Sequence, residues 1–483
     1  MITETQTRVI VLQLTDELLT QLQPFMAGLD ITIAPHNKGA SQEVFARVEQ
    51  RGQHVAPFKC GPDYIDPSYH ALAASRPCAN LDAWMLPPAA IPGVLARRAH
   101  GADLALIEGV MGLFDGYAGD DDAGSTAHVA RLTDTPVLLV LDVRAVARTA
   151  AALVAGLRDF DRRVRVGGVI LNQVGSPRHP AIVKQAIEDA TGLPVLGWLL
   201  RDQAITLPER HLGLIPTAEP GRWQVWLVDV VERIAATVDL DRVLALARSA
   251  SPLPNATTPP ELTLAALGPS PVIAVAADEA FSFRYEENLD LLRAAGATIA
   301  RFSPLCDAAL PQGTQAVYLC GGFPELYAER LSANQSMLAA LRAAAAAGLP
   351  IYAECGGLMY LTEAVVDAAG TVFPMVGALP GRSVMTPRLT LGYRTVQALD
   401  ESWLWRAGEM VRGHEFHYST CAGIPETMPR LYAIQPDTLC SEPRVEGVHA
   451  GNVLASYVHL HFLAMPELAT RFVAAARAVK EPS

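Results

Sequence analysis

Short apolar runs alternate with amphipathic segments along two stretches of the chain. From residue 31 to residue 248 the apolar runs are ITIA, HVAPFK, LALIEG, PVLLVLD, VGGVILN and PVLGWL, separated by helical patterns rich in Ala, Arg and Leu. The alternation restarts with PVIAVAAD and continues through TIARFSP, AVYLCGG and PIYAECGG to a C-terminal helix that begins near Pro466. Strands and helices in this order are typical of parallel βαβ units. We therefore predict two α/β domains.

A different composition separates the two stretches. Residues 249–271, SASPLPNATTPPELTLAALGPSP, are rich in Pro, Ser and Thr and carry almost no charge. Segments of this kind commonly connect domains instead of packing into them. We therefore expect one domain at residues 1–248, a linker at 249–271 and a second domain at 272–483.

Composition excludes several classes of protein. The 483 residues carry a net charge of −12 and no basic run interleaved with aromatic residues, which argues against nucleic acid as a partner. No uncharged apolar stretch reaches the about 18 residues of a membrane span, and the start MITETQTRVIV is unlike a signal peptide. The seven cysteines form no C-x-x-C pair. We expect a cytoplasmic protein in a reducing compartment, without a disulfide framework or zinc site.

One cysteine lies where a nucleophile is expected. Cys355, in PIYAECGGLMYL, follows a buried strand and precedes a helix, and the two glycines after it permit a tight turn. Backbone N–H groups at the start of that helix favour a thiolate. About a hundred residues on, SYVHLHF supplies His459 as the base, with His461 as the alternative. The pattern predicts nucleophilic acyl transfer, whereas an isolated buried cysteine is usually core filler.

Glycines on both sides of this thiol are candidates for an oxyanion hole. The strand end AVYLCGGFPE carries Gly321 and Gly322, and Gly356 follows the cysteine directly. Unhindered backbone amides stabilise the negative oxygen of a tetrahedral intermediate. We assign this role to the amides of Gly322 and Gly356.

The first domain carries a polar cluster at the end of a predicted strand. Lys59, Asp63, Tyr64 and Asp66 follow the run HVAPF. Ligands of doubly wound sheets bind at such strand ends. A plain turn, formed by the prolines and aspartates of the same run, stays open as the alternative.

A second strand end in this domain has the features of a magnesium site. Glu108 ends LALIEG, and Asp115 lies seven residues further on among glycines that let a ligand approach the backbone. Carboxylates in this setting suit Mg²⁺ held against phosphate oxygens. A solvated loop is the alternative.

Two more strand ends carry weaker signals for a nucleotide. Asp142 and Arg144 follow PVLLVL, and Asn172 ends VGGVILN, where a purine base or a phosphate can be bound. Asn and Asp are also common turn formers, so each residue alone is weak evidence.

The run GHEFHYST brings three polar residues together in the second domain. The two histidines, His414 and His417, resemble a metal-binding pair, with Glu415 between them. No third ligand is evident. We expect hydrogen bonding to substrate here and no metal.

Eight runs in this order resemble the cobyrinic acid a,c-diamide synthase family, which includes the hydrogenobyrinate enzymes. They are FKCGPDYIDPSYH, EGVMGLFDG, VILNQVGSPRH, YLCGGFPELYAERL, AECGGLMYL, LGYR, GHEFHYS and SYVHLHF, and the resemblance extends from about His54 to the C-terminus. It implies an N-terminal ATP-dependent amide ligase domain of the P-loop, dethiobiotin-synthetase-like type. A class I glutamine amidotransferase domain of α/β fold follows. Glutamine is hydrolysed at Cys355 with His459 as base, and the ammonia attacks a substrate carboxylate that ATP has phosphorylated.

The resemblance also implies roles for residues of the first domain. Asp63 and Asp66 belong to the catalytic set that handles the substrate carboxylates, while Tyr64 and Ile65 bind the substrate and set the order of amidation. The acidic pair is linked to Mg²⁺ and phosphoryl transfer, with Glu108 as the metal ligand and Asp115 as a catalytic residue. Phosphorylation turns a poor acyl donor into a good one, and Mg²⁺ offsets the repulsion between two anions.

The chain departs from this family in its phosphate loop. Family members have G-x-x-x-x-G-K-[ST] after the first strand, whereas PHNKGASQEVF follows ITIA here. An ungapped comparison places Gln42 at the lysine and Glu43 at the Ser/Thr. Lys38, Gly39 and Asn172 are the nucleotide-binding residues that remain, and we expect weakened ATP binding. Residues 1–30 have no counterpart in the family plan and are expected to add a strand and a helix.

The leading interpretation is a carbon–nitrogen ligase with glutamine as nitrogen donor. It amidates the a and c acetate carboxylates of cobyrinate or hydrogenobyrinate in cobalamin biosynthesis. The expected ligands are the corrinoid, glutamine, ATP and Mg²⁺; neither nucleic acid nor a membrane is expected, and a homodimer stays open. Two alternatives are kept: diamidation of another metallo-tetrapyrrole such as Ni-sirohydrochlorin, and a ligase-impaired homologue that retains only a glutaminase or scaffold function.

Overall fold

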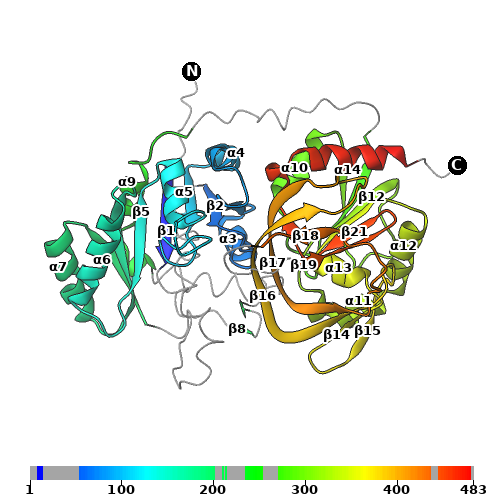
Figure 1. Cartoon of the computed structure of the whole chain (residues 1–483). Helices are drawn as coiled ribbons and strands as arrows, with labels where there is room; N and C mark the ends of the chain where they lie inside the picture. Colours follow the sequence, from blue (N-terminus) through cyan, green and yellow to red (C-terminus); the bar gives the residue numbers. More distant parts are fainter. Residues whose placement is uncertain are drawn as a thin grey trace. The chain divides into compact units, whose positions relative to one another are not determined.

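The chain divides into two compact units, Met1–Thr257 and Thr258–Ser483 (Figure 1). The structure is a computed structural model that describes residues 8–14, 54–201, 209–210, 213–214, 234–253, 270–436 and 444–479. The division falls inside the predicted linker at 249–271. Each unit is described by itself.

A parallel sheet of seven strands forms the centre of the first unit. Its order is β3-β2-β4-β1-β5-β6-β7. The strands are β1 (Arg8–Leu14), β2 (Val55–Cys60), β3 (Ala79–Leu81), β4 (Leu104–Glu108), β5 (Val137–Asp142), β6 (Val166–Val174) and β7 (Val195–Leu200), with a separate short pair β8 (Glu209–Arg210) and β9 (Gly213–Leu214). The helices are α3 (Asp66–Ala74), η1 (Pro88–Ala90), α4 (Ile91–Ala99), α5 (Thr126–Thr133), α6 (Thr149–Phe160), α7 (His179–Thr191) and α9 (Leu240–Ala247).

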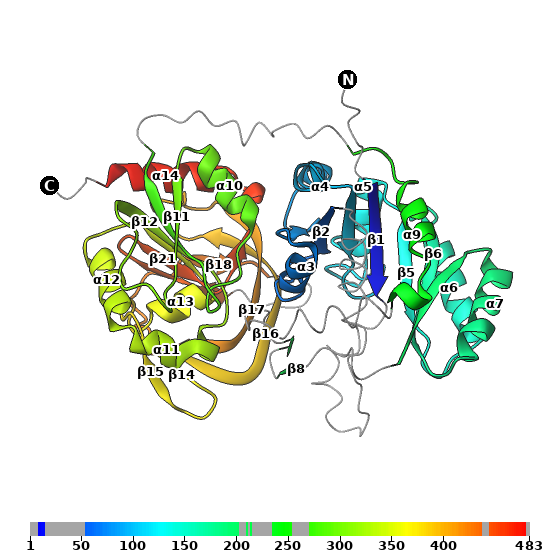
Figure 2. The same ribbon diagram turned by 180° about the vertical axis from the view of Figure 1, so that it is seen from behind.

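Helices cover this sheet on both faces, which explains its continuous apolar strands. Every residue of β2 and β4 is buried. On one face Ile10, Leu138 and Ile170 pack with α9 residues such as Val243 and Leu244. Helix α5 lies over the sheet in Figure 1, and α9 lies over it in the reverse view of Figure 2. Parallel sheets are typically buried in this way.

The position of β1 corrects the sequence analysis. Residues 1–30 were expected to be additional to the fold, yet Arg8–Leu14 pairs with both β4 and β5 in the middle of the sheet. The run RVIVLQL is apolar at most positions and so suits a buried strand. The predicted strand ITIA at 31–34 lies outside the described residues, as do Lys38, Gly39, Gln42 and Glu43.

The second unit contains two sheets. One has the order β11-β10-β12-β13-β21-β20, in which only β20 is antiparallel. The other has the order β15-β14-β16-β17-β22, with β18 paired to β16 and β19 paired to β18. The first contains β10 (Val272–Ala276), β11 (Thr298–Phe302), β12 (Thr314–Leu319), β13 (Ile351–Glu354), β20 (Val448–Ala450) and β21 (Val453–Ser456). The second contains β14 (Ala364–Val366), β15 (Val372–Pro374), β16 (Arg382–Ala398), β17 (Met410–Ala422), β18 (Tyr432–Ile434), β19 (Arg444–Glu446) and β22 (His459–Leu460).

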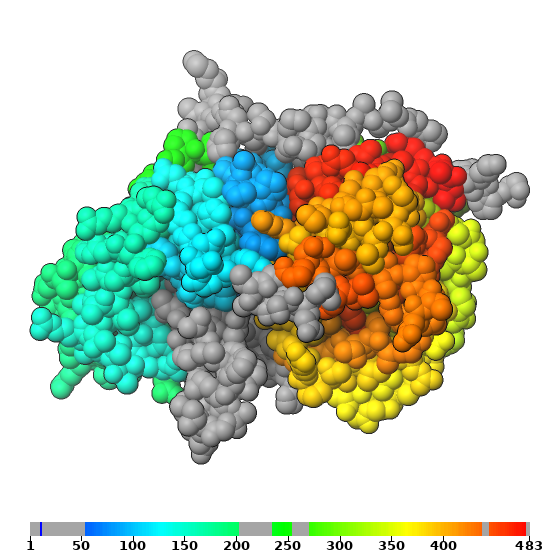
Figure 3. All heavy atoms as spheres, viewed as in Figure 1, coloured from blue at the N-terminus to red at the C-terminus, as the bar shows by residue number. Residues whose placement is uncertain are grey.

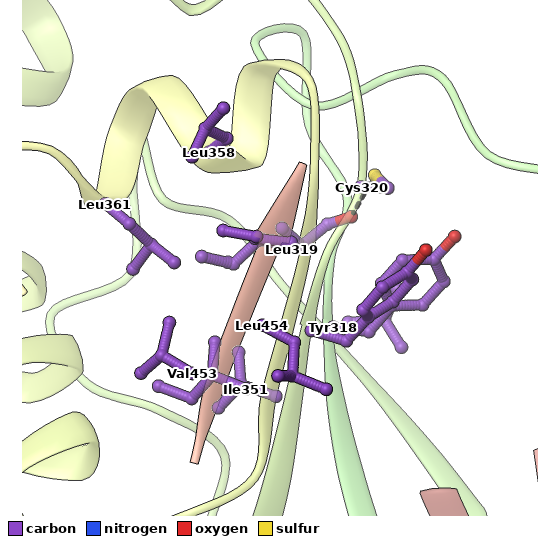
Figure 4. Packing of buried hydrophobic residues seen from close by; sticks show 14 of the residues in the cluster. Tyr318, Leu319, Cys320, Ile351, Leu358, Leu361, Val453 and Leu454 are labelled. Carbon is purple, nitrogen blue, oxygen red and sulfur yellow. Dashed lines mark hydrogen bonds between the residues drawn. The ribbon is translucent and has the colours of Figure 1, made fainter. Parts of the chain in front are cut away.

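The helices of the second unit close its core. They are α10 (Glu286–Ala294), η4 (Pro324–Tyr327), α11 (Ala328–Ala333), α12 (Gln335–Ala346), α13 (Gly356–Leu361), η5 (Phe462–Ala464) and α14 (Glu467–Ala478). Figure 4 shows Leu319 of β12 on the side of its strand that faces Leu358 and Leu361 of α13, with Tyr318 on the other side. Helix α14, red in Figure 3, lies against the orange segment near residue 405, where Arg471 binds Glu409.

Candidate active sites

Cys355 lies at a sharp turn between β13 and α13. Its backbone has φ 47° and ψ −101°, a strained conformation for a residue with a side chain. The Cys355 N–H donates to Ser456 O at 2.7 Å, and its carbonyl accepts from Met359 N at 3.0 Å in the first turn of the helix. The thiol lies 3.7 Å from Phe416 O. The geometry is that of the predicted nucleophile turn.

The two glycines assigned to the oxyanion hole lie together. A Cβ added at Gly356 would lie 3.1 Å from Gly322 N and 2.9 Å from Pro324 Cδ. Gly322 has φ +154°, and a Cβ there would come within 2.1 Å of Ala280 O. Only glycine fits at both positions without a shift of the backbone. The turn after β12 therefore lies directly against the start of α13.

The candidate base lies against the same turn. A Cβ added at Gly321 would lie 2.3 Å from His459 Cε1, so the absence of a side chain at this position makes room for the imidazole. The His459 ring stacks on His414 at a centroid distance of 4.8 Å and an angle of 13°. Phe283 contacts it edge-on at 4.5 Å. Gly321 lies against His459, the base, and Gly322 lies against Gly356, the residue after Cys355. The turn after β12 therefore contacts the segments that carry both reactive groups.

Burial favours the neutral forms of both the Cys355 thiol and the His459 imidazole. Burial raises the pKa of Cys355 well above its usual value, and the negative charge of Glu325 adds to the rise. Burial, together with the neighbouring His414, lowers the pKa of His459 well below its usual value. The Gly356 N–H at the helix start lowers the pKa of Cys355, the expected direction, but burial outweighs it. A neutral imidazole is nevertheless the form that can accept the thiol proton.

The residues of GHEFHYST contact other residues of their own unit. Glu415 is buried and accepts a hydrogen bond from Arg394 Nε at 2.6 Å and one from Arg444. Burial opposes its ionisation, but His417 and the two arginines outweigh burial and hold the pKa of Glu415 at about 2. His417 stacks on Tyr457 at 3.8 Å. Among the described residues, no group of three or more His, Cys, Asp or Glu side chains is arranged to hold a metal ion.

A second buried polar cluster lies at the carboxyl ends of β2 and β4 in the first unit. Lys59 is 1% exposed, and its Nζ lies 2.9 Å from Asp66 Oδ2, 3.2 Å from Glu108 Oε2 and 3.8 Å from Asp63 Oδ2. His70, also buried, binds the same oxygen of Glu108. The structure thus brings three predicted carboxylates around one lysine.

Glu108 is ionised and keeps one oxygen available. Burial opposes its charge, but Lys59 and His70 outweigh burial and lower the pKa of Glu108. Its Oε1 atom is buried and accepts no hydrogen bond within the part of the chain that the structure describes. An ionised carboxylate with an unused oxygen at a strand end fits a Mg²⁺ ligand. Because Lys59 already contacts this carboxylate, a bound metal ion would share Glu108 with the lysine.

The remaining predicted residues of this unit have local partners. Asp115 Oδ2 accepts from Gly112 N at 2.9 Å, which closes a turn in its own loop. Asp63 Oδ1 accepts from Ile65 N at 2.8 Å, and Ile65 is the residue before α3. Asn172 Oδ1 accepts from Gln173 N. Asp115 and Asn172 thus each bond to a backbone amide of their own segment.

Two residues in or beside this cluster, His70 and Asn80, were not predicted from the sequence. His70 binds Glu108 across 38 positions of sequence. Asn80 donates to Gly61 O at 2.8 Å and Asp63 O at 2.6 Å, and so fixes the loop after β2. His70 lies four residues after Asp66, the spacing that puts two helical side chains on one face, and this was the one available signal.

Comparisons with known proteins match both units. A CobQ/CobB/MinD/ParA nucleotide-binding domain matches residues 44–215, and a CobB/CobQ-like glutamine amidotransferase domain matches residues 272–466. Residues 44–215 begin after the altered loop. No helix in the described ranges is long and apolar enough to cross a membrane.

Similar whole proteins carry related names. A cobyrinate a,c-diamide synthase of Dehalococcoides mccartyi (strain CBDB1) is 46% identical over 437 residues, 90% of this chain and 94% of that protein. A hydrogenobyrinate a,c-diamide synthase of Thermobifida fusca is 45% identical over 447 residues, 89% and 92% of the two chains. Among solved structures, PurLQS from Thermotoga maritima matches at 16% identity with a TM-score of 0.32, over 43% of this chain and 98% of that one, and this likeness carries no argument.

Proposed function

The chain belongs to the cobyrinate and hydrogenobyrinate a,c-diamide synthase family, and from this premise we propose that it amidates the a and c acetate carboxylates of a cobyrinate-type corrinoid. It is a glutamine-dependent carbon–nitrogen ligase with a nucleotide-binding domain and an amidotransferase domain. The observation that carries the substrate proposal is the 46% identity to a cobyrinate enzyme over 94% of its length.

The glutaminase step is assigned to the second unit. The Cys355 thiol gives its proton to His459 as its sulfur attacks the side-chain carbonyl carbon of glutamine. The amides of Gly322 and Gly356, whose backbones lie in contact, donate to the oxygen that becomes negative. Ammonia leaves with the proton returned by His459, and water then releases glutamate from the thioester.

The ligase step is assigned to the first unit. We assign the transfer of the γ-phosphate of ATP to the substrate carboxylate to the cluster of Lys59 with Asp63, Asp66 and Glu108, whose carboxylates lie within 3.8 Å of the lysine Nζ. Lys59 would attract both anions, and Glu108 would hold Mg²⁺ through its unused oxygen. Bound Mg²⁺ supplies charge neutralisation between the phosphate and the carboxylate. Ammonia then displaces phosphate from the acyl phosphate.

Acceptor competition tests the ring specificity. Equal concentrations of cobyrinate, hydrogenobyrinate and Ni-sirohydrochlorin are offered with glutamine, ATP and Mg²⁺, and amides are counted by mass spectrometry. We expect two amides on a corrinoid ring, with the single amide appearing first. Preferential amidation of Ni-sirohydrochlorin would replace the corrinoid proposal by the alternative tetrapyrrole.

The phosphate loop supports a second candidate function. In P-loop folds the loop joins a central parallel strand to a helix, and β1 ends at Leu14. Residues 15–22, TDELLTQL, contain neither glycine nor lysine, and G-x-x-x-x-G-K-[ST] occurs nowhere in the 483 residues. This favours the ligase-impaired homologue with a glutaminase or scaffold role. A cytoplasmic location and a homodimer also stay proposals.

Rebuilding the loop should restore nucleotide affinity. A missing lysine removes an attraction of about 4 kcal/mol at about 4 Å in a partly screened site. We expect weak binding of a non-hydrolysable ATP analogue with Mg²⁺ by calorimetric titration. The G-x-x-x-x-G-K-T loop is introduced either at residues 15–22, directly after β1, or at residues 35–42, the position expected from sequence, and the replacement at the true loop position should tighten binding by about tenfold or more. Tight binding by the natural chain, unchanged by either replacement, would contradict this prediction.

A further inference from the structure

Two side chains hold the backbone of the segment that carries the base. Leu460, the residue after His459, donates its N–H to Glu354 Oε1 at 3.0 Å. Its carbonyl accepts from Asn288 Nδ2 at 2.9 Å, and Phe462 N donates to Asn288 Oδ1 at 2.7 Å. The backbone immediately after the imidazole is therefore fixed from both sides by buried polar groups.

Glu354 is itself fixed at both oxygens. Tyr318 Oη donates to Glu354 Oε2 at 2.8 Å, and Tyr352 Oη donates to Oε1 at 3.0 Å. Asn288 Nδ2 lies 3.4 Å from the Tyr318 hydroxyl, so the two supports form one network. Glu354 is 1% exposed, and burial raises its pKa to about 7 against the opposing effect of these three donors. A buried carboxyl group with this many donors has a single orientation.

Through Glu354, this network connects the strand that carries Cys355 to the strand that carries His459. It is the residue before Cys355 and the last of β13, whereas His459 begins β22 in the other sheet. Between β21 and β22 the chain crosses from one sheet to the other, so the register of β21 alone does not place the imidazole. The hydrogen bond from Leu460 to Glu354 spans 106 positions and joins the nucleophile strand to the base strand.

We propose that Glu354 is a positioning residue of the glutaminase site, which holds His459 at the reach of Cys355 through the backbone of Leu460. The inference rests on the proposed glutaminase function of this site. Glu354 touches neither glutamine nor the transferred proton in this scheme. Its effect is exerted on the geometry of the base, where a displacement of about 1 Å can cost on the order of 100-fold in rate.

Two substitutions at Glu354 separate position from charge. Glu354→Gln and Glu354→Ala both remove the negative charge beside the thiol, but only glutamine keeps an oxygen that accepts from Leu460 N. In steady-state glutamate release by the full chain, Glu354→Ala should lower kcat about 30-fold and change KM less than about threefold, whereas Glu354→Gln should stay within about fivefold of wild type. Glu409→Ala is the matched control: it breaks the ion pair with Arg471 in the same unit and should leave kcat unchanged.

Alkylation of Cys355 by iodoacetamide gives a second readout that does not need turnover. With the base displaced, the Glu354→Ala thiol should react several-fold more slowly at pH 7 than the Glu354→Gln thiol, and the two should converge above pH 10, where hydroxide removes the proton. A purely structural loss would lower the melting temperature without moving this pH profile. Equal profiles for the two variants, or wild-type kcat in Glu354→Ala, would overturn the proposal.

Asn288→Asp carries the test if the alanine variant does not fold. It keeps the oxygen that accepts from Phe462 N and removes the donor to Leu460 O, so kcat should fall about tenfold; an unchanged kcat would overturn the proposal. If wild type itself releases no glutamate from glutamine, the glutaminase function is wrong. In that case slower alkylation of Glu354→Ala than of Glu354→Gln at pH 7 would still support the positioning role, and equal rates would overturn it.

Discussion

Replacing Cys355 with alanine should lower glutamate release from glutamine by about a thousandfold or more, because no other group replaces an attacking sulfur. Amide formation with free ammonia should remain within about twofold of wild type, since the ammonia-using step is assigned to the other unit. Both rates are measured on the same preparation, with glutamine or ammonium chloride as the only nitrogen source. The expected split is the signature of two separate sites.

A second cysteine provides the control for this experiment. Cys306 is exposed and lies in a turn after β11, so Cys306→Ser should leave both rates unchanged. Equal loss of the glutamine and ammonia reactions in Cys355→Ala would argue against two sites. Residual glutaminase activity near the wild-type rate would exclude Cys355 as the nucleophile.

Substitution of Glu108 by glutamine should have the opposite pattern. Amide formation should fall by about 100-fold or more with either nitrogen source, while glutamate release stays within about twofold of wild type. The change removes the charge that Lys59 and His70 contact and puts an amide where the unused Oε1 atom lies. The measurement compares amide and glutamate formation across a Mg²⁺ titration.

An acid-to-amide change elsewhere in the same unit is the matched control. Asp239 caps α9 by accepting from Arg242 N, and asparagine caps helices equally well, so Asp239→Asn should leave all rates unchanged. Near-normal amide formation by Glu108→Gln would make the Mg²⁺ assignment wrong. Parallel loss of glutaminase activity would instead indicate a general defect in folding.

The sequence supported the fold well where the signal was local. The alternating strands and helices, the α/β fold class and the family were predicted, and the comparisons confirm them. The turn at Cys355 was also predictable, because the two glycines that follow the cysteine after an apolar strand permit a tight turn. A strand within residues 1–30 was expected, but as an addition to the fold; the place of Arg8–Leu14 between β4 and β5 depends on pairing with distant segments, which the local pattern does not reveal.

The protonation state of Cys355 could not be predicted from the residues next to it in the sequence. The effect of a helix start depends on adjacent residues and can be read from sequence, but the burial of Cys355 and the charge of Glu325 arise only when distant segments pack. The same holds for the lysine cluster. Lys59 and Glu108 are 49 positions apart, and no pattern of apolar and polar residues in the sequence predicts their contact.

Nitrogen transfer is the measurement that tests the central claim most directly. The full chain is incubated with cobyrinate, Mg²⁺, saturating ATP and glutamine labelled with ¹⁵N in its side-chain amide, and the corrinoid product and glutamate are quantified together by mass spectrometry. The account predicts two ¹⁵N-labelled amides on the ring, at least one glutamate released for each, and no amide when ATP is omitted. Glutamate release with no labelled amide at any ATP concentration would contradict the synthase function and leave a glutaminase with an inactive ligase unit.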